Sequence, residues 1–255
     1  MTLFVMLVAL LVAVWVYMTL WFGLARWSDR TDVVDSAWGL GFVYVAWLAF
    51  AIGQHHLATQ WLTAGFVTIW GVRLFLHLTT RNMKKTEDYR YVAYREKWGK
   101  DYWQKAYVRI FMTQAILLWV ISLTVVASMA SSSVRWSWLA IAGFVVWAFG
   151  IIFETVGDWQ LRQFMKTRKK GQIMTTGLWR YSRHPNYFGE VAAWCGAGLV
   201  AVSLGQWWGL LGSLTITILI LKVSGIPPLE KHYEGNQTFE KYKKRTSILF
   251  PLPRR

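Results

Sequence analysis

Long apolar runs, separated by polar segments rich in Lys and Arg, constrain the fold of this chain more than any other feature. About seven runs follow one another along the 255 residues. A helix needs about 20 apolar residues to cross a bilayer. We therefore predict an all-α, polytopic membrane bundle of about seven transmembrane helices, at approximately residues 2–25, 36–53, 59–79, 108–130, 137–157, 187–204 and 207–226. Between and after them we expect a long polar loop at 80–107, a second polar loop at 158–186 and a tail at 227–255.

The composition agrees with a bilayer protein. Only 16% of the residues are charged, whereas a soluble domain carries roughly a quarter. The 18 Trp and 11 Tyr are typical of a membrane–water interface. Residues 2–25 have no basic residue before their apolar run and are long for a signal peptide, so we expect a first span. The single cysteine, Cys195, lies in an apolar run and predicts neither a disulfide nor a metal site.

The basic residues predict the orientation. If there are seven spans, 25 of the 28 Lys and Arg residues fall on one side, and the opposite connections hold only Arg135. Positive charge stays in the cytoplasm, so we predict an outer N-terminus and a cytoplasmic C-terminus. Nucleic acid is not an expected partner, because the charges lie in short connections. We see no linker and expect one domain, 1–255, with halves 1–107 and 108–255.

Several ionisable residues fall within or beside spans, where they are costly and often functional. Arg73 and His77 are four apart and share a helix face, either as snorkelling groups or as ligand-binding groups. Lys222, near a span end, is expected to snorkel. A polar stripe follows the fifth span, either as a ladder of ion pairs or as a site for phosphates and a ribose hydroxyl: Glu154, Asp158, Arg162 and Lys166.

The most informative local signal is the sequence GLWRYSRHPNYFGE at 177–190. Pro185 keeps His184 out of the helix and suits the first turn of the sixth span. The free N–H groups and the dipole of a helix N-terminus favour an anion. A buried carboxylate one turn into the span favours a ligand site over a plain basic loop. The candidate ligand-binding residues are Arg180, Tyr181, Arg183, His184, Asn186, Tyr187 and Glu190.

The C-terminal tail, 227–255, mixes basic and aromatic residues and also contains Glu230 and His232. A polybasic segment on anionic lipid is one interpretation. The other is a short amphipathic helix that folds back over the site and contributes Tyr242 and Arg245.

These motifs resemble known families. The segment RHPNYFGE, with the later YKKR and FP, resembles the C-terminal half of steroid 5α-reductases and the wider superfamily with isoprenylcysteine carboxyl methyltransferases. The segments DVVDSAWG (32–39), WGVRL (70–74) and RNMKKTEDYRY (81–91) resemble a bacterial branch known as DUF1295, which implies a bacterial inner membrane. The orientation predicted from the basic residues then places the cofactor site on the cytoplasmic side.

The resemblance implies residue roles. In steroid reductases the matching Asn and Glu contact NADPH, which implies Asn186 and Glu190 here. By the same resemblance Asp158, Arg162, Tyr242 and Arg245 are implied in cofactor binding. The implied reaction is hydride transfer from NADPH to a carbon–carbon double bond conjugated to a carbonyl, in a lipophilic substrate taken from the bilayer.

The catalytic side departs from the family pattern. Steroid reductases use a Glu in the second span and a Tyr in the third, whereas this chain has no Glu in its second span and has Trp70 near the tyrosine position. The acid is therefore predicted among Asp35, Tyr44 and His77, with Asp32 also near. Helix N-capping is the alternative role of Asp35.

Two other functions stay open at this point. The shared Arg-His-Pro-x-Tyr element is compatible with a methyltransferase that uses S-adenosylmethionine. That cofactor has no phosphates, so Arg162 and Lys166 favour the reductase. A lipid-binding protein without chemistry leaves Glu190 unexplained. The expected partners are membrane lipids and a small lipophilic substrate.

Overall fold

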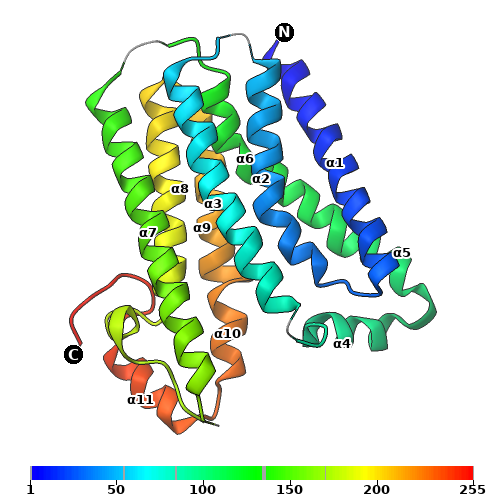
Figure 1. Ribbon diagram of the computed structural model, residues 1–255, viewed down its shortest axis with the longest axis vertical. Coiled ribbons are helices and arrows are strands. Elements are labelled where there is room, and N and C mark those ends of the chain that lie inside the picture. The colour runs from blue at the N-terminus through cyan, green and yellow to red at the C-terminus, as the bar shows by residue number, and fades with distance from the viewer. Residues whose placement is uncertain (1, 54, 84, 134–135, 170, 255) are drawn as a thin grey trace. The chain divides into compact units, whose positions relative to one another are not determined.

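The computed structural model describes residues 2–53, 55–83, 85–133, 136–169 and 171–254, and in these residues it is helical, without a strand (Figure 1). The fold class is therefore confirmed. Four basic residues used in the orientation argument, Lys84, Arg135, Lys170 and Arg255, lie outside the described residues. The long helices are α1 (Leu3–Ser28), α2 (Val33–Ile52), α3 (Ala58–Asn82), α6 (Thr113–Met129), α7 (Trp138–Thr167) and α8 (Pro185–Ser203). α9 (Leu210–Ile218) is shorter and belongs to the helical stretch Trp207–His232.

The chain divides into two compact units. Unit 1 comprises Met1–Arg135 with Leu204–Gly209, and unit 2 comprises Trp136–Ser203 with Leu210–Arg255. The sequence halves divide after residue 107, so the compact units divide elsewhere. The reason is α6, which packs against α1, α2 and α3 and therefore belongs to unit 1.

Unit 1 is built around the close pairing of α2 and α3. A side chain at Gly39 would overlap Gly71 O and lie 2.8 Å from Phe75 N, so only glycine permits this approach. Phe42 and Val67 are buried in the same interface, with Leu118 of α6. At the far end, Gln60 Nε2 donates to Met129 O (2.9 Å) and Ser131 O (3.0 Å), which satisfies the carbonyls at the end of α6.

The segment 80–107 corrects the sequence analysis, which predicts a polar loop. It contains α4 (Tyr89–Trp98) and α5 (Tyr102–Ala106). Asp88 begins α4 by accepting a hydrogen bond from Arg90 N at 3.0 Å. Burial opposes the ionisation of Asp88, but the hydrogen bonds from Arg90 prevail and lower its pKa, so the cap is charged at neutral pH.

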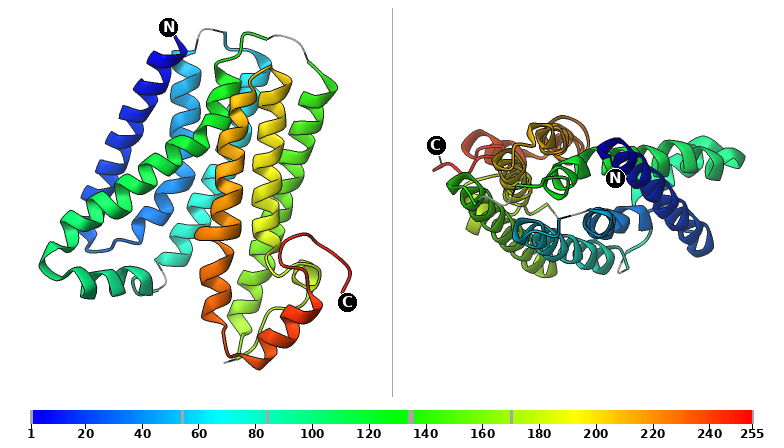
Figure 2. Two further views of the ribbon diagram at one scale, coloured as in Figure 1. Left: turned by 180° about the vertical axis from the view of Figure 1, so that it is seen from behind. Right: turned by 90° about the horizontal axis from the view of Figure 1, so that it is seen from above.

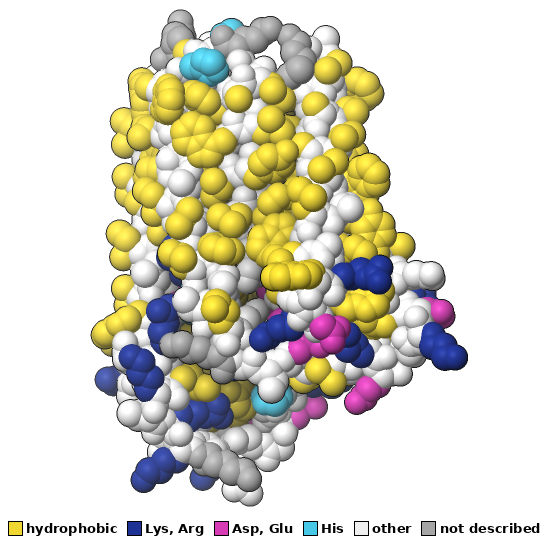
Figure 3. Space-filling model, turned by 45° about the vertical axis from the view of Figure 1, so that its right-hand side comes forward, with side chains coloured by type: hydrophobic (Ala, Val, Ile, Leu, Met, Phe, Trp, Pro, Cys, Tyr) yellow, Lys and Arg dark blue, Asp and Glu magenta, His cyan; other side chains and the backbone are white. Residues whose placement is uncertain are grey.

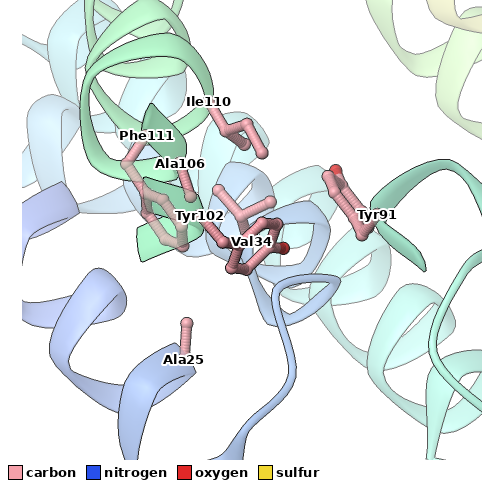
Figure 4. Packing of buried hydrophobic residues seen from close by; sticks show 7 residues of the cluster. All are labelled: Ala25, Val34, Tyr91, Tyr102, Ala106, Ile110 and Phe111. Atoms are coloured by element: carbon pink, nitrogen blue, oxygen red, sulfur yellow. The ribbon is translucent and has the colours of Figure 1, made fainter. Parts of the chain in front are cut away.

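Aromatic side chains explain why this segment folds as helices. Figure 4 shows Tyr91 of α4 and Tyr102 of α5 in one apolar cluster with Val34 of α2 and Phe111. Arg95 lies over the rings of Tyr102 (4.6 Å) and Trp103 (4.9 Å). The segment therefore folds as helices because Tyr91 and Tyr102 are buried in this cluster, while Tyr89 and Tyr94 stay exposed among the charges.

Unit 2 is built around the antiparallel pair α7 and α8, which lie side by side in Figures 1 and 2. Glycines recur every seven residues at the contact: Gly143, Gly150 and Gly157 on α7, and Gly189 and Gly196 on α8. A side chain at Gly196 would lie 2.6 Å from Gly143 O, so the backbones touch. α9 joins α8 through Ser213 Oγ, which donates to Trp194 O at 2.7 Å.

Two short helices follow the last long one in unit 2. These are α10 (Ile226–His232) and α11 (Gln237–Arg245), and Asn236 caps the second by accepting from Thr238 N (2.9 Å) and Phe239 N (3.1 Å). Phe239 and Tyr242 are buried while Lys241, Lys244 and Arg245 are exposed. The predicted amphipathic tail helix is therefore confirmed as α11.

Six helical stretches of the described chain are long and apolar enough to cross a membrane, which makes this a multi-pass integral membrane protein. Hydrophobic side chains cover much of the helical face that Figure 3 shows. α8 is absent from the six because Asn186 and Glu190 in its first turns lower its hydropathy. Since α8 runs antiparallel along the apolar part of α7, we keep it as a crossing helix.

The orientation is a prediction that cysteine labelling tests. In a Cys195→Ala background, Ser132→Cys is expected to react with a membrane-impermeant maleimide on intact cells, because the positive-inside rule places the 131–136 connection outside. Lys241→Cys, on exposed α11, is expected to react only after permeabilisation. The reversed pattern would overturn the orientation.

Candidate cofactor site

The polar stripe lies on one continuous helix. α7 is 30 residues long, or about 45 Å at 1.5 Å per residue, so its C-terminal turns extend past the apolar part. Glu154 and Asp158 are buried, with 3% and 7% exposure, while Arg162 and Lys166 are exposed. Lys166 Nζ donates to Gln163 Oε1 at 3.0 Å. The stripe therefore passes from buried carboxylates to exposed cations.

Asn186 connects this stripe to α8. Pro185 begins α8, as predicted, and the Asn186 Nδ2 group donates to Asp158 Oδ1 at 3.2 Å. Gly157 permits the approach, because a side chain there would lie 3.1 Å from Asn186 N. Asn186 Oδ1 is buried and has no hydrogen-bond partner within the described part of the chain. The site thus holds a buried acceptor whose partner is still to be supplied.

Glu230 of α10 gathers three basic side chains. Its Oε1 lies 3.1 Å from Arg183 Nε and 3.1 Å from His184 Nε2, and its Oε2 lies 3.8 Å from Lys243 Nζ. Arg183 and His184 are almost fully buried. Arg183 also donates from Nη1 to Lys243 O at 3.3 Å. The positive charge before α8 is therefore fixed by an internal carboxylate.

The tail is fastened to the motif by backbone hydrogen bonds. Arg183 N donates to Ser247 O (2.8 Å), Leu252 N donates to Tyr181 O (3.0 Å), and Ser182 Oγ donates to Leu249 O (2.7 Å). Trp179 Nε1 donates to Gly157 O at 3.1 Å, which anchors the motif to α7.

The Tyr242 hydroxyl belongs to this fastening. It donates to Trp179 O and to Ser182 O, the latter at 3.2 Å. Burial raises the pKa of Tyr242, so the hydroxyl stays protonated and remains a donor. Tyr242, predicted as a cofactor-binding residue, is therefore buried and holds the 177–190 motif through hydrogen bonds to its backbone.

The remaining predicted residues of unit 2 lie around this frame. Tyr181 is 43% exposed, and the Arg180 guanidinium lies 6.0 Å from its ring centroid. The Tyr187 ring stacks against His184 at 5.8 Å. Glu190 is half-buried one turn after Asn186, and Arg245 is exposed at the end of α11.

The predicted catalytic residues all belong to unit 1, and Asp35 is the one most enclosed by polar partners. It is the third residue of α2, after the N-cap position Asp32, so the N-capping alternative is wrong. Its Oδ1 accepts from the Tyr91 hydroxyl at 2.8 Å, and its Oδ2 accepts from Arg90 Nη2 at 3.1 Å. Asp32 is instead held by Arg30, with Nη2 to Oδ2 at 2.8 Å.

Tyr44 and His77 differ in their relation to Asp35. Tyr44 lies nine residues along α2, about 13 Å away along the axis, where it is 39% exposed and stacked on Tyr17 at 5.5 Å. The structure therefore does not bring Tyr44 to Asp35. His77 is half-buried on α3, between Gly71, which meets Gly39, and Asn82, whose Nδ2 donates to Asp32 O. His77 is thus level with the first turns of α2.

Two residues of these clusters were missed as site residues. Tyr91 falls in a segment predicted as loop, and the available signal was that it lies, like Asp35, in one of the segments that carry the family resemblance. Glu230 is noted only as part of the tail, 46 residues from His184. The available signal was a Glu next to Lys231 and His232 just after the last predicted span.

Comparison with known proteins gives the family. A family model described as "Protein of unknown function (DUF1295)" matches residues 21–246. The chain belongs to the DUF1295 family. An uncharacterized protein of Schizosaccharomyces pombe is 24% identical over 233 residues, which cover 76% of this chain and 66% of that protein. No solved structure matches the chain.

The chain is also distantly similar to steroid dehydrogenases. The 3-oxo-5-alpha-steroid 4-dehydrogenase 1 of Rattus norvegicus is 32% identical over 114 residues, which cover 44% of this chain and 41% of the dehydrogenase. That of Homo sapiens is 30% identical over 112 residues, which cover 43% and 40%. The matched region is thus about two fifths of the length of these dehydrogenases.

Proposed function

We propose that this membrane protein is an NADPH-dependent reductase of a carbon–carbon double bond in a lipophilic, steroid-like or isoprenoid-like substrate. The observation that carries the proposal is the buried, unsatisfied Asn186 Oδ1 beside Asp158. The distant similarity to 3-oxo-5-alpha-steroid 4-dehydrogenases supports the class of reaction.

The residues of unit 2 suit a dinucleotide. Asn186 Oδ1 accepts, and the carboxamide N–H or a ribose hydroxyl of the cofactor donates. Arg162, Lys166, Arg180 and Arg245 are exposed cations for phosphates, and the α8 N-terminus adds its free N–H groups. NADPH would supply a hydride to one carbon of the double bond.

The other carbon of the double bond requires a proton. Among Asp35, Tyr44 and His77, we favour Asp35 acting with Tyr91. The Tyr91 hydroxyl donates to Asp35 Oδ1 at 2.8 Å, so in this carboxylate–phenol pair the phenol carries the proton and Asp35 orients it. Arg90 at 3.1 Å fixes the second carboxylate oxygen. A fixed donor of this kind requires little reorganisation during reaction.

Asn186→Leu tests the cofactor site. We expect NADPH to bind purified wild-type protein saturably and Asn186→Leu to weaken it at least tenfold, since about 1.4 kcal/mol of lost hydrogen bonding is tenfold in Kd. Thr155→Val is the matched control, because Thr155 is exposed on α7 and bonds only its own helix, at Ile151 O (2.6 Å), among its described contacts.

The same titration compares NADPH with NADH and S-adenosylmethionine. Saturable binding of S-adenosylmethionine alone would replace the reductase by the methyltransferase alternative. Binding of none of the three would point to a lipid-binding protein without this chemistry. Equal NADPH affinity in Asn186→Leu and wild type would show that the cofactor does not use Asn186.

A further inference from the structure

An open depression of about 610 Å³ lies in unit 2 beside the polar end of α7. Ligand pockets are commonly about 300–1,000 Å³, so this one has room for a nucleoside with a phosphate. It is bordered by the last turns of α7, the segment that follows it and the start of α11. Its lining residues are Phe164, Gly171, Gln172, Ile173, Thr175 and Thr238. None of these is among the sequence-predicted site residues.

The lining combines apolar and hydroxyl groups. Phe164 and Ile173 offer the flat and aliphatic surfaces on which a base can stack. Thr175 and Thr238 each carry a hydroxyl that both donates and accepts, which suits a ribose. Gly171 shapes the border, because its φ of +84° lies in the left-handed region that favours glycine. This composition fits a nucleoside better than an acyl chain.

Two guanidinium groups are hydrogen-bonded to the backbone carbonyls of residues that line the depression. Arg168 Nε donates to Gln172 O at 3.0 Å, and Arg254 Nη2 donates to Thr175 O at 3.3 Å. A guanidinium has five N–H donors, so each anchored group keeps donors for an incoming anion. Arginine binds phosphate through paired N–H groups. These hydrogen bonds hold the guanidinium groups of Arg168 and Arg254 next to residues that line the depression.

We propose that this depression binds a phosphorylated ribose with its base, namely the 2′-phospho-adenosine end of NADPH, and that Arg168 and Arg254 bind the phosphate monoester. The inference rests on the proposed function and adds to it a basis for selecting NADPH over NADH, which lacks that phosphate. A lipid headgroup offers related phosphate chemistry, so the test separates the two sources.

The experiment measures binding to the full chain in nanodiscs of phosphatidylcholine, which has no net charge. NADPH, NADH and 2′,5′-ADP are titrated against wild type, Arg168→Gln, Arg254→Gln and the double variant. We expect the double variant to lose about tenfold or more in affinity for NADPH and 2′,5′-ADP, from the lost charge-assisted bonds. NADH affinity should stay within about twofold, as only the phosphate contact is removed. Lys241→Gln on exposed α11, which removes one charge as each single arginine variant does, is the control for those single variants.

The outcomes separate this inference from the proposed function. If wild type binds NADPH and NADH equally, or if the double variant has the same Kd as wild type for both NADPH and 2′,5′-ADP, the depression does not bind the 2′-phosphate. The reductase proposal then stands. If wild type binds neither dinucleotide, both proposals fall. If the double variant binds 2′,5′-ADP as tightly as wild type and loses only its association with phosphatidylglycerol, the arginines serve a lipid headgroup, and the inference is overturned.

Discussion

Glu230→Ala is expected to destabilise the protein and to abolish cofactor binding. Removing this carboxylate leaves Arg183, which is 7% exposed, as a buried cation without its ion-pair partner. Breaking a buried pair in this way costs about 3–5 kcal/mol. The contact of Lys243 adds little, because that side chain is 46% exposed and 3.8 Å away. Thermal unfolding in detergent should therefore fall by about 10 °C or more for a chain of this size.

Two further variants serve as controls for the Glu230→Ala experiment. Glu240→Ala removes a carboxylate from exposed α11 and should leave the midpoint nearly unchanged. The double variant Arg183→Met/Glu230→Leu replaces the pair by apolar side chains of similar size and should recover much of the lost stability, while NADPH binding stays lost. A Glu230→Ala variant as stable as wild type would show that the Arg183–Glu230 contact does not hold the motif.

The helices were predictable where one physical rule determines them. Apolar length determines the spans, and the ring of Pro185 determines where α8 begins, because proline lacks an N–H and fixes φ. The stripe from Glu154 to Lys166 follows from the four-residue repeat alone. The helices in segment 80–107 were not predicted, because its charged residues outweigh its aromatic residues in the mean hydropathy of the segment. Only the packing with Val34 and Phe111 shows that Tyr91 and Tyr102 are buried.

The sequence predicted which residues belong to the candidate site but not which residues they contact. Asn186 and Asp158 follow from motif and repeat, but their 3.2 Å hydrogen bond depends on the register of α7 against α8. That register is set by tertiary packing of glycines. Glu230 and Tyr91 act through residues 46 and 56 positions away. Such pairings are decided by which helix packs on which, and a single sequence carries little information about that.

Gly150→Ala is expected to have the largest effect on the α7–α8 pair. Its new methyl group would overlap Ala193 N and lie 2.6 Å from Gly189 O, and backbone on a packed helix cannot turn aside as a side chain does. We expect a loss of at least about 3 kcal/mol, the upper end of ordinary overpacking. Thermal unfolding followed by tryptophan fluorescence measures it. Gly65→Ala on α3 is the control, because nothing lies within 4 Å of its new methyl group.

The other glycines of α7 make the prediction quantitative. The new methyl group of Gly143→Ala would lie 2.9 Å from Gly196 O and Val200 N, and that of Gly157→Ala would lie 3.1 Å from Asn186 N. The loss of stability should therefore be largest for Gly150→Ala, smaller for Gly143→Ala and smallest for Gly157→Ala. Cofactor binding should follow a different order, because Gly157 lies against Asn186 itself. A Gly157→Ala variant that unfolds normally but binds NADPH more weakly would tie the close approach of the two helices to the site. Identical losses of stability and binding across all three would mean that the glycines serve packing alone.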